Sequence, residues 1–220
     1  MGNLFNVDNP FFAFLSKLCD MFFLSVIWIL LCIPVITIGP ANTAMYYAAV
    51  KVIRRERGYL TREFFKSFKM NFKRGAIMGV ILTIIYIVLG YDLIWSWGML
   101  NAHSKYGSIM FGVFIAITFL VLCYSIYAYP ILSRFDMTLK QLFKAASFMS
   151  MRHLPFTLGM AILTVAAGAV LILIPISIFI VPALVTVLNS LLMERVLKKY
   201  MPEKSEENPD ETRKDEWYLE

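Results

Sequence analysis

Residues that hold metals or perform covalent catalysis are scarce in this chain. It has only two histidines and three cysteines, and Cys19, Cys32 and Cys123 all lie inside apolar runs without a CxxC spacing. Cysteine in such a position usually behaves as a small apolar residue. Because His103 and His153 lie on different predicted connections, the sequence predicts neither a metal site nor a cofactor.

Motifs of common enzymes are also missing. The sequence has no GxxxxGKS/T phosphate loop, no HExxH zinc motif and no GxSxG nucleophile elbow. It also lacks paired inner-face carboxylates with metal-ligand spacing, since Asp136 stands alone. We therefore expect that the protein is not an enzyme.

Charged residues make up only 16% of the chain, whereas hydrophobic residues make up 59%. Ordinary soluble domains contain about 25% charged and about 45–50% apolar residues. A soluble core could not cover so much apolar surface, so we expect an all-α integral membrane protein. We assign the net charge of +6 to the inner rim of the bilayer and expect no nucleic-acid partner.

Six apolar runs predict the helices of this membrane domain. Four of them reach the roughly 20 residues that a spanning helix needs. The other two are weaker, and each follows a proline. The strong runs cover residues 18–38, 76–97, 109–131 and 156–181, and the weak runs cover residues 41–53 and 183–197.

The two weak runs belong to similar proline-bounded hairpins. In each half, an apolar helix is followed by Ile-Pro, a short apolar link, Pro-Ala and a second helix that ends in basic residues. Proline fits the first turn of a returning helix, where its missing N–H costs nothing. Both an internal repeat and coincidence among apolar residues would explain the match. The predicted hairpin turns contain Pro34, Gly39, Pro40, Pro175 and Pro182.

The distribution of basic residues bears on the number of crossings. With six crossings and both termini inside, Lys105 is the only basic residue outside. Length argues the other way, because residues 41–57 reach only about 25 Å at the helical rise. We therefore expect about six transmembrane or re-entrant helices, in two proline-bounded hairpins and two central spans. This domain covers residues 1–201, and residues 202–220 form a disordered cytoplasmic tail.

Basic amphipathic helices are predicted on the inner face. In residues 61–75, four basic residues share one helical face and three phenylalanines line another, and residues 138–151 repeat this pattern more weakly. Such helices lie in the membrane interface or dock a cytoplasmic partner. The residues predicted to make these contacts are Arg62, Phe65, Lys66, Phe68, Lys69, Phe72 and Lys73.

Polar and small residues also interrupt the apolar zone. Polar residues are costly at such depths and often functional, and Asn189 is the deepest of them. Asn42 directly follows Pro40 and also fits a cap of the returning helix, whereas Asp92 fits an outer interface among aromatic residues. Gly75 and Gly79 form a GxxxG motif, which predicts close contact between helices.

Four segments carry a family resemblance: Leu4-Phe5-Asn6 with Asp8-Asn9-Pro10, the turn at 34–41, Ala44-Met45-Tyr46-Tyr47 and residues 64–73. Together they resemble the YesL-type family of Gram-positive bacterial membrane proteins, a domain of unknown function. The resemblance implies a bacterial plasma membrane and gene association with carbohydrate ABC importers, and it implies no catalytic residues. One departure is Ser25, where the family pattern has an asparagine; if that asparagine bonds across helices, the contact is altered in this chain.

Two functions from different classes are consistent with these observations. The first is a non-catalytic accessory protein for carbohydrate, or oligosaccharide, ABC import, with the lipid bilayer and ABC transporter components as partners. The alternative is a stand-alone small-solute transporter whose site lies at the proline-broken hairpins. The lack of charge in mid-span argues against the transporter. Either protein would be multi-pass, with both termini in the cytoplasm.

Overall fold

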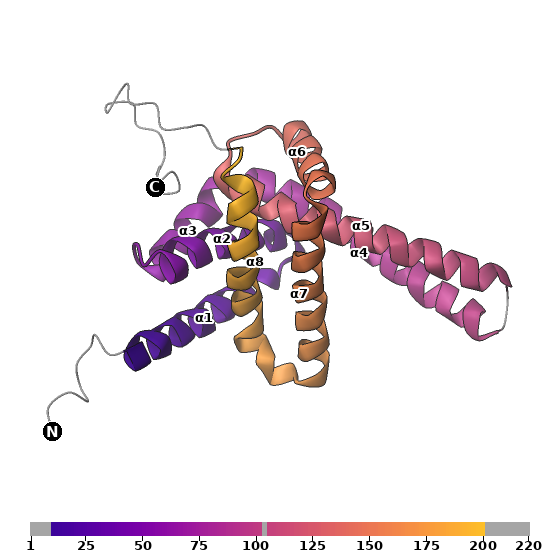
Figure 1. Cartoon of the computed structure of the whole chain (residues 1–220), viewed down its shortest axis with the longest axis horizontal. Coiled ribbons are helices and arrows are strands. Elements are labelled where there is room, and N and C mark those ends of the chain that lie inside the picture. Colours follow the sequence, from indigo (N-terminus) through magenta and orange to yellow (C-terminus); the bar gives the residue numbers. More distant parts are fainter. Residues whose placement is uncertain (1–9, 103–104, 201–220) are drawn as a thin grey trace, which may run out of the picture.

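The computed structural model describes residues 10–102 and 105–200, and this part of the chain is helical without any strand. The all-α prediction is therefore confirmed (Figure 1). The predicted tail at 202–220, together with His103, lies outside the described residues. The elements are α1 (Pro10–Cys32), η1 (Val35–Thr37), α2 (Ile38–Ala48), the π-helical turn η2 (Ala49–Arg54), α3 (Leu60–Met70), α4 (Phe72–Asn101), α5 (Lys105–Arg134), α6 (Leu139–Arg152), α7 (Leu154–Leu173), η3 (Pro175–Phe179) and α8 (Val181–Leu197).

Four helices among the described residues, namely α1, α4, α5 and α7, are long and apolar enough to cross a membrane. This supports a multi-pass membrane protein. The count of six crossings is not established, because α2 has 11 residues and α8 has 17. Two predicted spans also end early: α1 stops at Cys32 and α7 at Leu173. Both stops come just before an Ile-Pro pair, where proline disfavours helical geometry in the preceding residue.

The weak apolar run after Pro40 forms the central helix of the fold. Nine of the 11 residues of α2 are buried, and α2 contacts α1, α3, α4, α5 and α8. A helix that is surrounded by other helices does not have to be apolar on every face, and small residues let its neighbours approach. The low hydrophobicity of α2 therefore reflects contact with protein in place of lipid.

Glycine makes the closest of these contacts. A Cβ atom on Gly39 of α2 would overlap the carbonyl oxygen of Gly75, and one on Gly79 would lie 2.6 Å from the Cα of Gly39. The close helix contact predicted from the GxxxG motif is therefore confirmed, and its partner is the start of α2.

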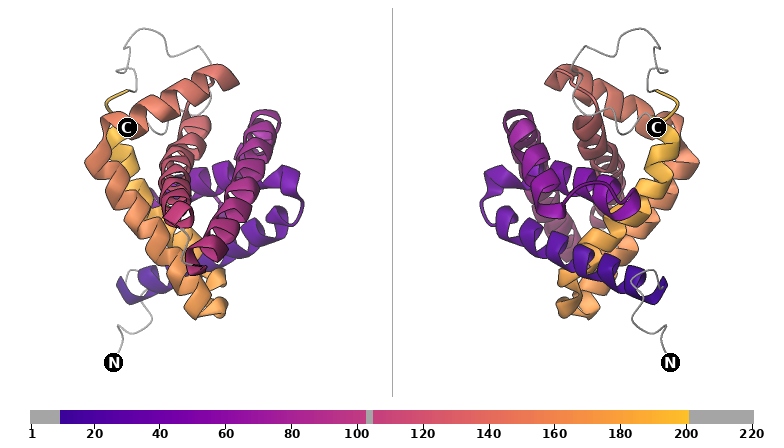
Figure 2. Two further views of the ribbon diagram at one scale, coloured as in Figure 1. Left: turned by 90° about the vertical axis from the view of Figure 1, so that its right-hand side faces the viewer. Right: turned by 90° about the vertical axis from the view of Figure 1, so that its left-hand side faces the viewer.

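The first hairpin (α1, η1 and α2) packs against the second (α7, η3 and α8), while the α4–α5 hairpin projects from the rest (Figures 1 and 2). Ser25 of α1 is fully buried, and its Oγ accepts a hydrogen bond from the backbone N–H of Ala183 at 3.3 Å. The contact across helices predicted at this position therefore exists here with serine. The projecting arm exposes large side chains, among them Ile87 and Ile94 at 65% and 76%. Such a surface needs lipid or protein to cover it.

Candidate functional site

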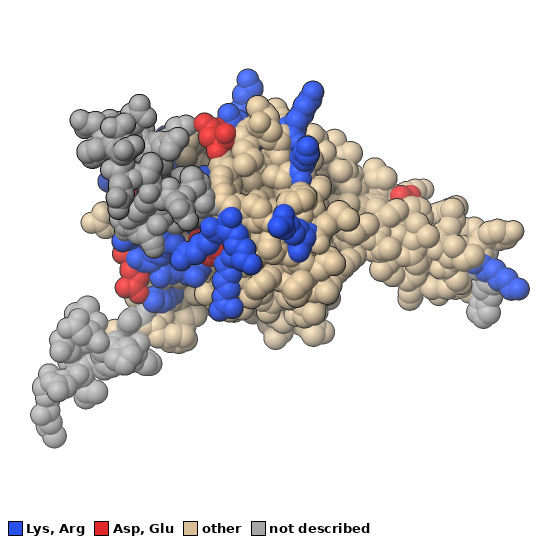
Figure 3. All heavy atoms as spheres, turned by 45° about the horizontal axis from the view of Figure 1, so that its top comes forward, with Lys and Arg blue, Asp and Glu red and all other residues tan. Residues whose placement is uncertain are grey.

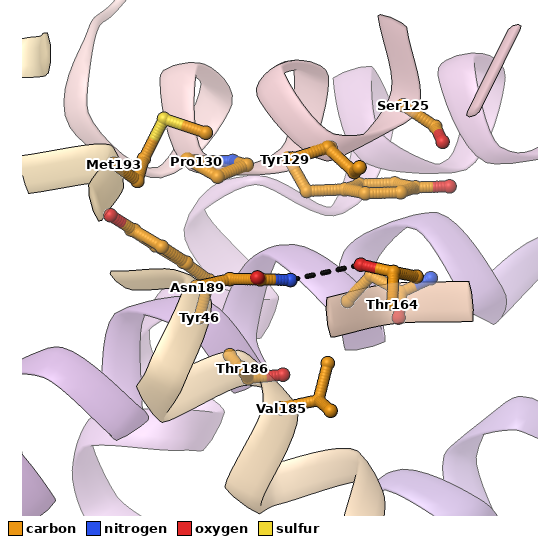
Figure 4. A pocket seen from close by; sticks show the side chains of 11 residues that line it. Tyr46, Ser125, Tyr129, Pro130, Thr164, Val185, Thr186, Asn189 and Met193 are labelled. Carbon is orange, nitrogen blue, oxygen red and sulfur yellow. Dashed lines mark hydrogen bonds between the residues drawn. The ribbon is translucent and has the colours of Figure 1, made fainter. Parts of the chain in front are cut away.

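A pocket of about 200 Å³ lies between α2, α5, α7 and α8, and both polar and apolar side chains line it (Figure 4). Both proline-bounded hairpins contribute to it, since α2 ends the first and α7 and α8 form the arms of the second. None of its lining residues is charged. The polar lining residues are Asn42, Tyr46, Ser125, Tyr129, Thr164, Thr186 and Asn189, and the apolar ones are Ile126, Pro130, Val185 and Met193.

Asn189 is the most informative of these residues. Its Nδ2 donates a hydrogen bond to Thr164 Oγ1 at 3.0 Å, whereas its buried Oδ1 has no hydrogen-bond partner (Figure 4). A buried amide oxygen without a partner costs roughly 1–3 kcal/mol. This unsatisfied acceptor belongs to a residue that lines the pocket. Asn42, on the opposite hairpin, accepts a hydrogen bond from Trp28 Nε1 at 2.9 Å through its Oδ1.

The two threonines of the pocket donate hydrogen bonds to the backbone of their own helices. The hydroxyls of Thr164 and Thr186 each donate to the carbonyl four residues earlier, on Met160 and Pro182, at 2.8 Å. Such bonds let a hydroxyl sit inside an apolar helix. Thr164 Oγ1 also accepts the hydrogen bond from Asn189, so each of these hydroxyl oxygens keeps at least one lone pair as an acceptor.

A cluster of charged residues is buried beside this pocket. Glu194 Oε1 accepts hydrogen bonds from the Tyr46 hydroxyl at 2.8 Å and from Arg134 Nη2 at 2.6 Å. Arg55 Nη2 lies 3.8 Å from the other carboxylate oxygen. The side chains of Arg134 and Glu194 are 0% and 6% exposed. Charges buried to this degree are stable only when they are paired, so the cluster ties α2, α5 and α8 together.

Sequence reasoning missed this cluster. Arg134 and Glu194 lie near the ends of apolar helices, where charged residues usually face water, and sequence separation hides that they meet. The one available signal was Glu194 itself, a single carboxylate at the end of a helix otherwise rich in apolar residues. Asp136, the carboxylate for which the sequence shows no carboxylate partner, forms an ion pair with Arg74.

The basic helix predicted at 61–75 is two helices. α3 ends at Met70, and Asn71 separates it from α4, with its side-chain amide bonded to the Ser67 carbonyl at 3.2 Å. Phe72 and Lys73 therefore belong to α4, because an asparagine that bonds the backbone in this way favours a helix end. The predicted basic residues Arg62, Lys66, Lys69 and Lys73 are all exposed.

The aromatic residues of this region divide into two groups. Phe64, which the sequence analysis did not select, is fully buried, and Phe68 stacks on it with 6.3 Å between ring centroids. Phe65 and Phe72 are 42% and 41% exposed. The predicted aromatic face is therefore split: α3 is held to the fold by Phe64 and Phe68, and only Phe65 and Phe72 remain on the surface.

The second predicted segment forms α6, which begins with a capping box made by Thr138 and Gln141. Its Leu142 and Ala146 are buried and its Lys140 and Lys144 are exposed, as the amphipathic pattern predicts. Figure 3 shows lysines and arginines gathered over one region of the molecule, whereas the projecting hairpin is largely uncharged. We call the side formed by loop 55–59, loop 135–138 and the end of α8 the basic side.

The predicted turn residues lie at the ends of the short helices. Pro34 precedes η1, and Pro175 is the first residue of η3. Gly39 and Pro40 lie in the first turn of α2, and Pro182 lies in that of α8.

Taken together, these features define a class: a multi-pass α-helical membrane protein with an uncharged pocket between two hairpins. Residues 21–93 match the model of a family described as a protein of unknown function, DUF624. The family resemblance predicted from the sequence is therefore confirmed over this part of the chain. A relative, the uncharacterized protein YteU of Bacillus subtilis (strain 168), is 27% identical over 157 residues, which cover 69% of this chain and 68% of that protein. No solved structure matches the chain.

Proposed function

We propose that this chain is a small-solute transporter that binds an uncharged, hydrogen-bonding solute in the pocket between its two hairpins. The observation that carries this proposal is the buried Oδ1 of Asn189, which has no partner in a pocket lined by hydroxyl and amide groups. A site built to bond a polar molecule leaves such groups unsatisfied until that molecule arrives.

The chemistry of the lining argues for a neutral solute. An ion in a membrane-embedded site needs a compensating charge or a dense cage of oxygen ligands. The lining has two asparagine side chains, hydroxyl groups and two tyrosines, and no charged group. Amide and hydroxyl groups both donate and accept hydrogen bonds, which suits hydroxylated or amide-bearing solutes.

Two contacts support an even number of crossings in each half of the fold. Lys17, near the start of α1, pairs with Glu56 in the loop after η2 at 2.7 Å. The hydrogen bond from Lys17 lowers the pKa of the Glu56 carboxyl. His153, at the end of α6, lies 3.0 Å from the Tyr200 hydroxyl beyond α8. Each hairpin therefore begins and ends close together, as both two-crossing and re-entrant hairpins do. Our proposal is six crossings, with both termini in the cytoplasm of a bacterial plasma membrane.

Swelling of proteoliposomes in isotonic solute tests the transport proposal. Vesicles with the purified protein should swell in glycerol, ribitol or glucose faster than vesicles without protein. They should not swell faster in sodium chloride, because the pocket offers no charge to an ion. Equal swelling with and without protein in every uncharged solute would overturn the proposal.

A second function is favoured by the exposed basic surface of α3 and the start of α4. We propose as the alternative that the chain is a non-catalytic accessory protein of a carbohydrate ABC importer, docking through this surface. Support comes from Phe65 and Phe72, whose rings are exposed beside four lysine and arginine side chains. Aromatic rings and arginine are favoured at protein interfaces, although the same surface suits anionic lipid.

Leucine substitutions distinguish a protein partner of this surface from anionic lipid. The double variant Phe65→Leu and Phe72→Leu keeps apolar area for lipid but removes the rings that a protein pocket would recognise. Membrane insertion should be unchanged, and a permease that co-purifies with wild type should be lost. If the same permease is recovered with both proteins, or with neither, the accessory function is contradicted.

A further inference from the structure

The buried cluster of Tyr46, Arg134 and Glu194 lies next to the pocket, and its residues come from α2, α5 and α8. On α8, Met193 lines the pocket and is followed at once by Glu194. On α5, Pro130 lines the pocket and Arg134 follows one helical turn later. Tyr46 of α2 joins the two sites, because its side chain lines the pocket while its hydroxyl donates to Glu194. A solute leaving the pocket toward the basic side therefore meets the cluster first.

The cluster closes this route. The side chains of Arg134 and Glu194 are almost completely buried, and Leu132, Val196 and Leu197 around them are buried as well. Arg54 adds a further bond between η2 and α8, donating to the Ser190 carbonyl oxygen at 3.0 Å and to its Oγ at 3.2 Å. These buried, bonded side chains occupy the space between the helices at this end of the pocket.

The position of Pro130 gives this closure a way to open. Proline inside a helix removes one backbone hydrogen bond and crowds the carbonyl four residues earlier, so the helix bends there most easily. In α5 that point falls at the pocket, one turn before Arg134. Bending at Pro130 would displace the end of α5, with the Arg134 guanidinium, relative to the rest of that helix.

We infer that Arg134, Glu194 and Tyr46 form a gate that closes the pocket toward the basic side, with Pro130 as its hinge. This inference rests on the proposed solute site but concerns access to it. The gate is closed in this structure, because Glu194 accepts hydrogen bonds from both Tyr46 and Arg134. It opens when the Arg134–Glu194 ion pair separates.

The reaction rate of a cysteine in the pocket measures the gate directly. Thr186 lines the pocket, so Thr186→Cys is made in a background with Cys19, Cys32 and Cys123 replaced by serine or alanine. The probe is a charged, membrane-impermeant methanethiosulfonate, applied to right-side-out and to inverted vesicles. Tyr59→Cys, at an exposed position of loop 55–59, identifies which vesicles expose the basic side.

Glu194→Gln should raise the labelling rate of Thr186→Cys about tenfold, from the basic side alone, because Arg134 loses its ion pair with Glu194. The matched control is Asp136→Asn, which breaks the exposed ion pair with Arg74 and should leave the rate unchanged. The double exchange Arg134→Glu with Glu194→Arg should bring the rate back toward wild type. If the ion pair only stabilised the fold, its loss would not increase labelling from one side alone, and the charge exchange would not reverse such an increase.

Tyr46→Phe keeps the proposal testable if Glu194→Gln does not fold. It removes one hydrogen bond to the gate and should raise the same rate by a few-fold. Folding of each variant is checked by monodisperse elution in detergent. Wild-type rates in every variant that folds would overturn the gate. Because labelling requires no transport, the absence of solute uptake by wild type would reject the proposed function while leaving the gate result to stand.

Discussion

Single residues set the packing of α2 at the centre of the fold. Gly39, Gly75 and Gly79 bring two helix backbones closer than any side chain would allow. Gly90, in the same helix as Gly79, has no neighbour near its missing Cβ. Gly79 and Gly90 are therefore a matched pair of test positions within α4, one crowded and one open.

Gly79→Ala should destabilise the protein by about 1–3 kcal/mol or prevent its folding, because the added methyl has no space. Gly90→Ala should be neutral or stabilising by up to about 1 kcal/mol, since alanine favours a helix interior. Thermal unfolding in detergent, followed by circular dichroism, measures both. Similar loss of stability in the two variants would contradict the close contact between α2 and α4.

A second buried ion pair fixes α3 to the fold. Lys51 Nζ lies 2.8 Å from Glu63 Oε2, and both side chains are only 10–11% exposed. Lys51→Met alone should cost about 3–5 kcal/mol, because it leaves the carboxylate buried without its partner. The double variant Lys51→Met and Glu63→Leu should recover most of this loss, since apolar replacement of a buried pair is often neutral. A double-mutant cycle measures the coupling, and additive losses would show that the pair contributes little.

The positions of the helices were largely predictable from the sequence. The residues at which helices end, and the neighbours against which they pack, were less predictable. Apolar runs predict α4, α5 and α7, because every face of these helices must suit lipid or protein. The central role of α2 was not predictable, since burial against other helices relaxes the demand for apolar residues. The pocket was anticipated only in part. Asn42 and Asn189 were selected for their depth, but nothing local indicated that α5 and α7 would complete the site.

α3 shows how a single helix end changes a predicted surface. Helical periodicity placed Phe65, Phe68 and Phe72 on one face of a single helix. In the structure the helix ends at Met70, and Phe72 begins α4. Phe64→Ala should therefore cost about 3–5 kcal/mol, as expected for a large ring in a core. Phe65→Ala should change the stability little, because its ring is exposed. Thermal midpoints of the two variants in detergent compare them, and equal losses would mean that the face predicted from periodicity is the packed one.

At the scale of the whole molecule, the two hairpins determine the topology. With six crossings, the start of α1 and loop 55–59 lie on one side of the membrane, opposite the tip of the α4–α5 hairpin. Ser16→Cys and Tyr59→Cys should then react with an impermeant thiol reagent from the same side, and Tyr106→Cys from the other. All three positions are exposed. Labelling of Ser16→Cys and Tyr59→Cys from opposite sides would mean that α2 does not cross.

The pocket between those hairpins is the central claim, and the uptake of uncharged solute by matched variants tests it most directly. Asn189→Leu replaces the open acceptor with a branched apolar side chain, while Thr83→Val removes a comparable hydroxyl in α4 outside the pocket. In the swelling assay with ribitol, Asn189→Leu should reduce the protein-dependent rate at least about tenfold, as expected when a polar solute loses a buried partner. Thr83→Val should retain the wild-type rate. Full uptake by folded Asn189→Leu protein would contradict the assignment of the pocket as the solute site.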